Sequence, residues 1–430
     1  MPEQNKQAGK ARILFVAEAV TLAHVARPVT LAKALDPQSF DVHLAHHPRY
    51  RELLGTLELT EHEIHSIPPR QFTEALAAGR PLYDYATLKA YVEEDLQLLS
   101  KVQPSVVVGD FRLSLAVSTR IVGIPYIALS NAYWSPYCRQ RYVVPELPMT
   151  RVLGSTLGQM VFSLARPFAF ALHCLPMNRL RRSYGLAGLG FDLREVYTHA
   201  DYTLYADIPD LYRMQNLPPH HRFIGPVVWS PSFPRPSWWD DLPPGPPQGR
   251  PIVYVTLGSS GQASLLPTLV DALGRLDVTA LVSSAGAPLP QNVPANVYPA
   301  TYLPGADAVT LSRLVICNGG SPGTHQALVQ GVPVIGVAGN LDQYLNMAAI
   351  QKTGAGLCLR AGTCHAGQLA AAVMRMLADP AYRTAAQKLA ARLLHYNPVA
   401  QLRKTIDELL PPPHRLPMND TPPTICGVSP

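Results

Sequence analysis

The chain has 430 residues, 47% of them hydrophobic, which is enough to build two hydrophobic cores. The formal net charge of +6 is modest for this length, and no run of Lys and Arg with interleaved aromatics indicates nucleic-acid binding. The six cysteines are scattered without a CxxC pair, which indicates buried or idle thiols in a reducing compartment.

The first segment of the chain predicts a doubly wound α/β domain. Residues 1–12 are polar and have the features of neither a signal peptide nor a membrane anchor, so we expect a cytoplasmic protein without a stable membrane span. Residues 12–17 are an apolar run typical of a first parallel strand, residues 24–35 have helical spacing, and residues 41–45 form a second strand. No GxGxxG follows the first strand, so a nicotinamide or flavin Rossmann domain loses its main support.

Two polar residues of this domain are predicted to lie at one edge of its sheet. His24 begins the first helix, and Asp110 ends the buried strand 105–110. The carboxyl ends of parallel strands are where α/β proteins bind ligands, and Asp110 is placed there to orient and charge-stabilise His24. The alternatives are that His24 is a helix-capping or merely exposed histidine and that Asp110 caps the helix beginning near Leu113.

An aromatic and proline-rich segment follows at residues 131–149. Its prolines forbid regular strand pairing, so we predict a long loop over a pocket, with Tyr133, Trp134 and Tyr137 as candidate contacts to an acceptor. Residues 152–175 are strongly apolar but interrupted, and they fall short of a clean membrane span. We predict one or two helices lining an acceptor site, with peripheral contact to a membrane or a lipid-like acceptor; a plain core helix is the alternative.

The second half of the chain restarts the same pattern after a linker. Residues 1–228 form the first domain, residues 229–250 are a Pro-rich linker, and residues 251–394 form the second domain. Residues 252–256 are a strand, and the small-residue turn after it contains Ser259 and Ser260. The tail 411–430 lacks periodicity and is predicted to be disordered.

Residues 314–347 contain a glycine-rich turn between a strand and a helix. Strand 314–317 leads into the turn 318–324, and after a second strand a loop presents Asp342 and Gln343 before a helix that starts near Tyr344. Bare N–H groups and the positive end of a helix dipole make such a turn a good anion site. On its glycines alone, an ordinary tight βα turn is the favoured interpretation.

This stretch resembles the donor-binding signature of the GT-B glycosyltransferases related to the bacterial, family 1 type UDP-glycosyltransferases. In that signature a His-Gly-Gly-type turn precedes a helix, and an Asp-Gln or Glu-Gln pair follows Gly-Val-Pro. The spacing from Asn318 to Gln343 is preserved, while Asn318 replaces the usual turn histidine and Gln326 the usual ribose-binding glutamate. The resemblance implies two facing Rossmann-like doubly wound domains with a cleft between them, and a helix at 395–410 that crosses back onto the first domain.

The resemblance also implies the roles of the site residues. His24 is the general base and Asp110 its partner; Tyr302 stacks on the nucleobase, Gln326 contacts the ribose, and Asp342 and Gln343 bind the donor sugar. The donor diphosphate is held by residues of the two small-residue turns, namely Ser259, Ser260, Asn318, Gly320, Ser321, Gly323 and Thr324.

The implied function is transfer of a sugar, with inversion, from a UDP- or dTDP-sugar to a hydroxyl or other nucleophile of a small, partly apolar acceptor such as a secondary metabolite. The second domain has no Asp-x-Asp to hold a metal–diphosphate, which fits a metal-independent enzyme without a cofactor other than its nucleotide-sugar co-substrate. We expect a monomer or homodimer that binds no nucleic acid. A nucleotide-sugar epimerase and a catalytically silent GT-B-like partner or activator protein remain as alternatives.

Overall fold

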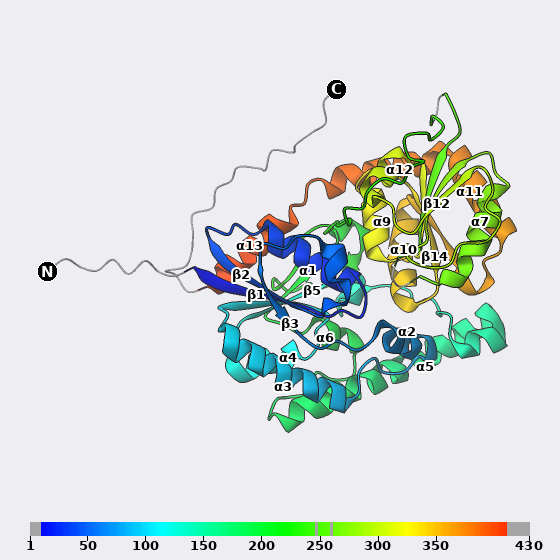
Figure 1. Cartoon of the computed structure of the whole chain (residues 1–430). Helices are drawn as coiled ribbons and strands as arrows, with labels where there is room; N and C mark the ends of the chain where they lie inside the picture. Colours follow the sequence, from blue (N-terminus) through cyan, green and yellow to red (C-terminus); the bar gives the residue numbers. More distant parts are fainter. Residues whose placement is uncertain (1–9, 246–247, 259–260, 411–430) are drawn as a thin grey trace.

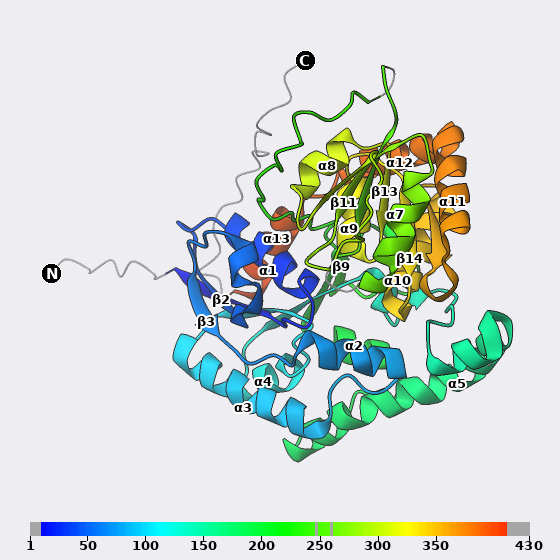
Figure 2. The same ribbon diagram turned by 45° about the vertical axis from the view of Figure 1, so that its right-hand side comes forward.

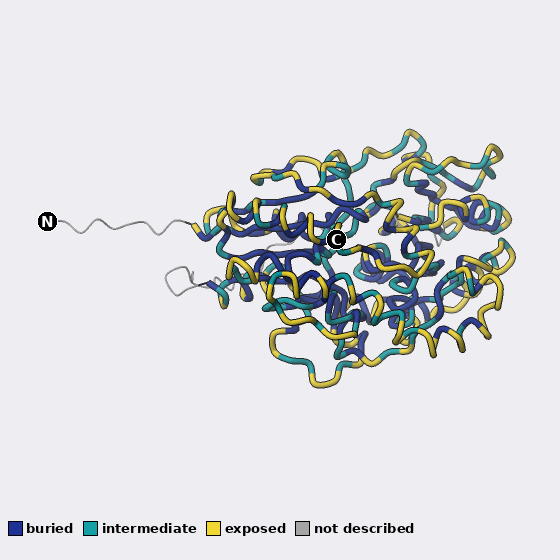
Figure 3. Tube along the Cα trace, turned by 90° about the horizontal axis from the view of Figure 1, so that it is seen from below, coloured by how far each residue is buried: buried dark blue, intermediate teal, exposed yellow. Residues whose placement is uncertain are grey.

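Two α/β domains make up the molecule, an N-terminal domain and a C-terminal domain that meet along one side (Figure 1). The computed structural model describes residues 10–245, 248–258 and 261–410. Buried chain runs through the inside of both domains, and exposed positions gather on the outer helices and loops (Figure 3).

The N-terminal domain is built on a seven-stranded parallel sheet in the order β3-β2-β1-β4-β5-β7-β9. Its strands are β1 (Ala11–Ala17), β2 (Phe40–His46), β3 (Thr60–Glu63), β4 (Val106–Asp110), β5 (Tyr126–Ser130), β7 (Tyr202–Tyr205) and β9 (His221–Phe223). Its helices are α1 (Ala23–Ala34), α2 (Pro69–Ala78), α3 (Tyr85–Val102), α4 (Leu115–Val122), α5 (Pro148–Ser183) and α6 (Leu193–Thr198). A separate two-stranded antiparallel ribbon joins β6 (Cys138–Arg139) to β8 (Arg213–Met214).

The C-terminal domain repeats this design with a six-stranded parallel sheet in the order β12-β11-β10-β13-β14-β15. The strands are β10 (Ile252–Thr256), β11 (Thr279–Ser283), β12 (Val297–Ala300), β13 (Leu314–Cys317), β14 (Val334–Ala338) and β15 (Gly356–Arg360). The helices are α7 (Leu266–Gly274), α8 (Gly305–Leu311), α9 (Ser321–Leu328), α10 (Leu341–Thr353), α11 (Ala366–Ala378) and α12 (Pro380–Leu393).

The central strands are apolar along their whole length because helices cover both faces of each sheet. β4 and β5 are buried at every position, and β1 is buried at all but one. Such continuous burial explains why these strands are apolar runs instead of alternating patterns. In both sheets the strand order reverses at the middle, between β1 and β4 and between β10 and β13.

The last helix, α13 (Pro398–Leu409), leaves the C-terminal domain and packs on the first (Figure 1). Leu402 and Ile406 are fully buried in the same apolar cluster as Val25 and Val29 of α1. The two domains are therefore tied together twice, by the segment that precedes β10 and by this returning helix.

The aromatic segment after β5 differs from its prediction as a loop over a pocket. Tyr133 is fully buried, and it belongs to an apolar cluster that contains residues of both domains, such as Tyr212 and Leu345. The segment is thus part of the packing between the domains. The apolar run predicted at residues 152–175 is longer than expected, since α5 covers 36 residues with a kink at Gly154.

Another difference concerns the segment after β14, predicted as a loop with a helix starting near Tyr344. α10 begins at Leu341, because the Asn340 side chain accepts a hydrogen bond from the Gln343 N–H and caps the helix. Asp342 and Gln343 therefore lie in the first helical turn. Ser259, Ser260 and the tail 411–430 lie outside the described residues.

Candidate active site

The carboxyl edge of the N-terminal sheet carries the predicted histidine and aspartate. His24 follows β1 and Asp110 ends the neighbouring β4, where Ala17 and Asp110 are register partners. This is the point at which the strand order reverses, the usual ligand position in an open α/β sheet. Asn131 follows β5 and Asp207 follows β7, so four polar residues line one edge.

His24 and Asp110 are in direct contact, as the sequence predicted. His24 Nδ1 lies 2.8 Å from Asp110 Oδ1, with the carboxylate fully buried and the imidazole partly exposed. The His24 ring stacks on Phe111, with centroids 4.6 Å apart. Phe111 has a φ of 59°, a left-handed conformation that is unfavourable for a bulky residue and that places its ring under the imidazole.

Arg27 is a third member of this group and was not identified from the sequence. Its Nε donates to Asp110 Oδ2 at 2.5 Å and its Nη2 to Asp110 Oδ1 at 2.9 Å. Burial is the largest influence and would raise the pKa of Asp110, but the contacts with Arg27 and His24 together hold that pKa below its ordinary value. Arg27 lies three residues after His24, so both side chains leave the same face of α1.

The ionised state of Asp110 fixes the tautomer of His24. A carboxylate can only accept hydrogen bonds, so the proton of a neutral His24 must sit on Nδ1, which donates to Asp110 Oδ1. Nε2 then carries the free lone pair. A hydroxyl placed next to Nε2 would meet a base instead of a hydrogen-bond donor.

Asn131 connects this group to the other domain. Its Oδ1 accepts from Arg27 Nη1 at 3.0 Å and from Ser321 Oγ, at the start of α9, at 3.4 Å. Its Nδ2 donates to Asp207 Oδ2 at 3.2 Å, and His325 Nε2 of α9 lies 3.3 Å from Asp207 Oδ1. The N-terminus of α9 is therefore directed at the His24–Asp110–Arg27 group.

The predicted diphosphate turn lies at the carboxyl edge of the C-terminal sheet. Asn318 follows β13, which neighbours β10, and the Asn318 Oδ1 accepts from the Gly320 N–H at 3.0 Å. Gly319 has a φ of 82°, and a Cβ there would lie 2.8 Å from the Met347 side chain, so only glycine fits. This turn is also at the point where the strand order reverses.

One predicted phosphate donor in this turn is already occupied. The Thr324 N–H donates to Gly320 O at 3.2 Å as the first bond of α9, and its fully buried Oγ1 also bonds backbone oxygens and Asn346. Thr324 therefore stabilises the turn, which corrects its prediction as a phosphate ligand. Ser321 and Gly323 precede the first helical hydrogen bond, whereas Pro322 between them has no N–H.

The two residues expected to bind a sugar have different environments. The half-buried Asp342 accepts a hydrogen bond from Trp134 Nε1 at 2.8 Å, across the domain interface. Burial raises the pKa of Asp342, and the Trp134 N–H acts in the opposite direction. Gln343 is buried, and its Oε1 accepts from the backbone N–H groups of Gly339 and Asn340, so the structure gives it a helix-capping role.

Aromatic side chains pack around Phe111, the ring on which His24 stacks. Phe111 contacts Phe72, Tyr83 and Tyr197, and Tyr197 packs edge to face on Trp134 with centroids 4.9 Å apart. Trp134 thus joins this aromatic group to Asp342, and its contact with an acceptor stays a prediction.

The other two residues predicted to contact an acceptor lie elsewhere. Tyr133 is in the core, so it offers no exposed face. Tyr137 packs edge to face against His221 of β9. Of the three predicted aromatics, only Trp134 lies among the rings that surround His24.

Tyr302 and Gln326 lie farther along the C-terminal domain. Tyr302 follows β12, is 37% exposed, and stacks one face on Phe233 of the linker with centroids 4.6 Å apart. The Gln326 amide lies against Gly305 at the start of α8, where a Cβ would be 2.9 Å away. Their contacts with a base and a ribose stay predictions.

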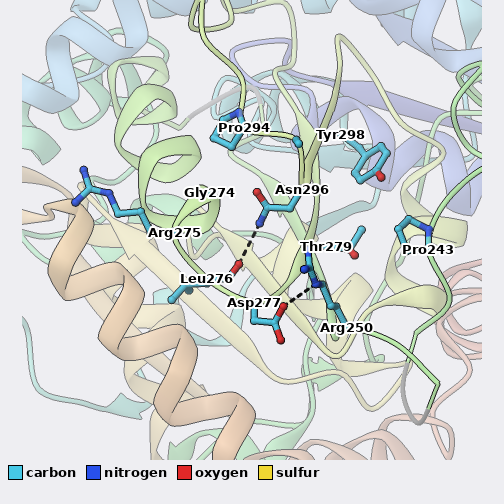
Figure 4. Close-up of a pocket in the computed structure, with 11 residues that line it drawn as sticks. Pro243, Arg250, Gly274, Arg275, Leu276, Asp277, Thr279, Pro294, Asn296 and Tyr298 are labelled. Atoms are coloured by element: carbon cyan, nitrogen blue, oxygen red, sulfur yellow. Dashed lines mark hydrogen bonds and ion pairs between the residues drawn. The ribbon is translucent and has the colours of Figure 1, made fainter.

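A surface hollow of about 510 Å³ lies at the opposite end of the C-terminal sheet (Figure 4). Arg250 and Asp277, which form an ion pair at 2.6 Å, line it together with Thr279 at the start of β11. These are the amino ends of the strands, so this hollow is separate from the site described above. In the described parts of the chain, no group of three or more His, Cys, Asp or Glu side chains could hold a metal ion.

Comparison with known proteins identifies the class. Residues 267–406 match the family model described as erythromycin biosynthesis protein CIII-like, C-terminal domain. The chain is 50% identical over 383 residues to a PGL/p-HBAD biosynthesis rhamnosyltransferase of Mycobacterium bovis (strain BCG / Pasteur 1173P2), covering 89% of this chain and 84% of that protein. A relative from the same organism, named an inactive PGL/p-HBAD biosynthesis glycosyltransferase, is 50% identical over 268 residues, 62% of this chain and 72% of its own length.

The fold is shared with solved glycosyltransferases. The spinosyn rhamnosyltransferase SpnG complexed with thymidine diphosphate has a TM-score of 0.62 at 21% identity, over 92% of this chain and 99% of that chain. The two facing parallel sheets are therefore a GT-B fold, which confirms the prediction. The chain belongs to the glycosyltransferase family that includes the mycobacterial PGL/p-HBAD proteins.

Proposed function

We propose that this glycosyltransferase moves a sugar, with inversion, from a UDP- or dTDP-sugar to a hydroxyl of a small, partly apolar acceptor. The observation that carries the proposal is the contact of the His24–Asp110–Arg27 group with the α9 N-terminus through Asn131. A base and an anion site thus face each other across the domain interface. The rhamnosyltransferase name of a relative at 50% identity supports a deoxysugar donor.

In the proposed reaction, His24 Nε2 takes the proton of the acceptor hydroxyl as that oxygen attacks the anomeric carbon. The bond from this carbon to the diphosphate breaks on the opposite face, and the nucleoside diphosphate leaves with the electron pair. General-base assistance contributes about 10²–10⁴-fold to such a reaction. Asp110 stabilises the imidazolium that forms, at a contact of 2.8 Å.

The leaving diphosphate is stabilised by the N–H groups of Ser321 and Gly323 and by the positive end of α9. One such preorganised donor contributes about 3 kcal/mol. Arg27 lies next to this site, since its Nη1 shares the Asn131 Oδ1 with Ser321 Oγ, but the Asp110 carboxylate offsets its charge. We propose that the neutral Asn318 amide and these N–H groups suffice for the phosphate charge, and that no metal ion or additional cofactor is required.

The acceptor is proposed to lie against the partly exposed rings of Phe111, Trp134 and Tyr197, where aromatic rings suit an apolar or aromatic body. On the donor side, Asp342 is proposed to bind the sugar through the carboxylate oxygen that Trp134 does not occupy. Tyr302 has one face on Phe233, so its other face is the proposed platform for the base. The enzyme is proposed to act in the cytoplasm as a monomer or homodimer.

Product analysis tests the proposed function and both alternatives. With UDP- or dTDP-sugars and a phenol or alcohol bearing an alkyl tail, we expect a glycoside of inverted anomeric configuration and a released nucleoside diphosphate, at a rate unchanged by EDTA. Sugar epimerisation with the donor alone would identify an epimerase. Absence of any nucleotide binding in titration calorimetry would identify a silent protein.

The Asn318→His variant tests the role of the turn. A histidine Nδ1 can accept from the Gly320 N–H as the Asn318 Oδ1 does at 3.0 Å, so the turn should persist. We expect nucleotide affinity to be equal or tighter, measured by titration calorimetry with UDP and dTDP. A large loss of affinity would show that the asparagine amide has a specific role that an imidazole cannot fill.

A further inference from the structure

The longest helix exposes a continuous apolar stripe on its outer face. α5 runs along the outside of the N-terminal domain, at the bottom of the molecule (Figure 2). Its exposed large apolar residues after the kink include Leu157, Val161, Leu164, Phe168, Leu172 and Leu175. These positions are spaced by three or four residues, so they lie on one face of the helix over about five turns.

The stripe is distinct from the face of α5 that packs on the domain core, because α5 has a second, buried face. Phe162, Cys174, Met177 and Leu180 are buried, and by helical geometry they point away from the stripe. Three of them belong to the apolar cluster that also holds Phe72 and Tyr83. The helix is therefore apolar on both sides, and only its inner side has a partner in the described chain.

Charge on the helix has a single sign. Between Pro148 and Ser183 there are five arginines and no aspartate or glutamate. Arg179 and Arg182 are exposed and continue the spacing of the stripe beyond Leu175. An apolar stripe that ends in exposed arginines matches a surface with an apolar interior and anionic headgroups.

We propose that the α5 stripe docks on the interfacial layer of an anionic lipid bilayer, with the helix lying flat. α5 is the one helix in the described ranges that is long and apolar enough to cross a membrane, and only 22% of its most apolar window is buried. Its inner face is fixed in the domain core, so it lies on a membrane and does not span it. A second copy of this chain is a poorer occupant, since its α5 offers no acidic residue to Arg179 and Arg182, whereas anionic headgroups supply that charge.

Docking would also place the acceptor side close to lipid. The inner face of α5 packs in the same cluster as Phe111, whose ring stacks on His24. An apolar acceptor dissolved in the bilayer would then have a short path to the base. This consequence rests on the proposed function, whereas the docking itself does not.

Vesicle co-sedimentation of the full chain tests the proposal. We expect the wild type to bind mixed phosphatidylglycerol–phosphatidylcholine vesicles, and the double variant Leu164→Ser with Phe168→Ser to bind them at least about tenfold more weakly. Arg182→Gln should weaken binding to these vesicles and leave binding to pure phosphatidylcholine unchanged. The matched control is Met374→Ser with Leu394→Ser, two exposed apolar residues of the C-terminal domain that should have no effect.

Two outcomes would overturn docking. In the first, the Leu164→Ser, Phe168→Ser variant binds vesicles as well as the Met374→Ser, Leu394→Ser control, or the wild type does not bind vesicles at all. The other is a wild-type dimer in sedimentation velocity that the stripe variant converts to monomers, which would make a second copy the occupant. Because the replaced side chains are exposed, circular dichroism and UDP or dTDP affinity should match the wild type in every variant, whether or not the chain transfers sugars.

Discussion

Replacing His24 with alanine is expected to lower turnover by roughly 10²–10⁴-fold, while the affinity for the nucleotide changes little. The imidazole is the one partly exposed base held against a buried carboxylate at this edge, at 2.8 Å from Asp110. Donor binding should survive because the anion site at the α9 N-terminus belongs to the other domain. Turnover is measured by release of the nucleoside diphosphate, and nucleotide affinity by titration calorimetry.

The His24→Ala result needs a matched control and a test for rescue. His395 is an exposed histidine after α12, and His395→Ala should retain the wild-type rate. Added imidazole should restore part of the activity of His24→Ala, because the lost group is a base next to a stacking ring, Phe111. A His24→Ala variant with near wild-type turnover would remove His24 as the base and leave the acceptor proton without a defined destination.

The sequence predicts the strands and the His24–Asp110 pair well because both depend on local patterns. β4 is a short apolar run ending in an acid, and parallel strands bring their carboxyl ends to a common edge. The sequence does not show that β1 and β4 are adjacent in the sheet. The structure pairs them and places Ala17 opposite Asp110, which brings His24 next to the carboxylate. The same strand–turn–helix pattern occurs in both halves of the chain and predicts two doubly wound domains, whereas the GT-B assignment rests on the resemblance of residues 314–347.

Two differences between the predicted and the observed helices have a local cause in the sequence. Asn340 and Gln343 have the spacing of a capping box, which places the start of α10 at Leu341 and engages Gln343 with its own backbone. Arg166 and Pro167 interrupt the apolar run of residues 152–175, yet α5 continues through both. Pro167 is exposed, so its ring and its missing hydrogen bond affect only the solvent side.

Other features could not be derived from one sequence, because they depend on contacts between distant segments. Arg27 becomes part of the site only where Asp110 and Asn131 converge on it, 83 and 104 residues away. Tyr133 is buried because Tyr212 and residues of the second domain pack on it. Hydrophobic periodicity does not specify which partners meet across a domain interface.

Replacing Asp110 with asparagine is expected to lower turnover by up to about 10⁴-fold through the tautomer of His24, as an aspartate-to-asparagine change does in a serine protease triad. An asparagine NH₂ directed at Nδ1 would favour the Nε2–H form, which presents a proton to the acceptor hydroxyl and not a lone pair. The measurement is the rate of sugar transfer with donor and acceptor saturating, so that weaker binding does not contribute.

Asp110→Asn also has a structural effect that must be separated from the chemical one. Arg27 makes two hydrogen bonds to the carboxylate, and removing one partner of a buried ion pair costs about 3–5 kcal/mol of folding free energy. The double variant Asp110→Asn with Arg27→Met removes both charges and should regain much of that stability in urea unfolding. If turnover stays low while stability returns, the loss of turnover comes from the His24 tautomer and from the missing charges. If turnover returns together with stability, Asp110 acts only by stabilising the fold, and the proposed mechanism loses Asp110 as the partner of the base.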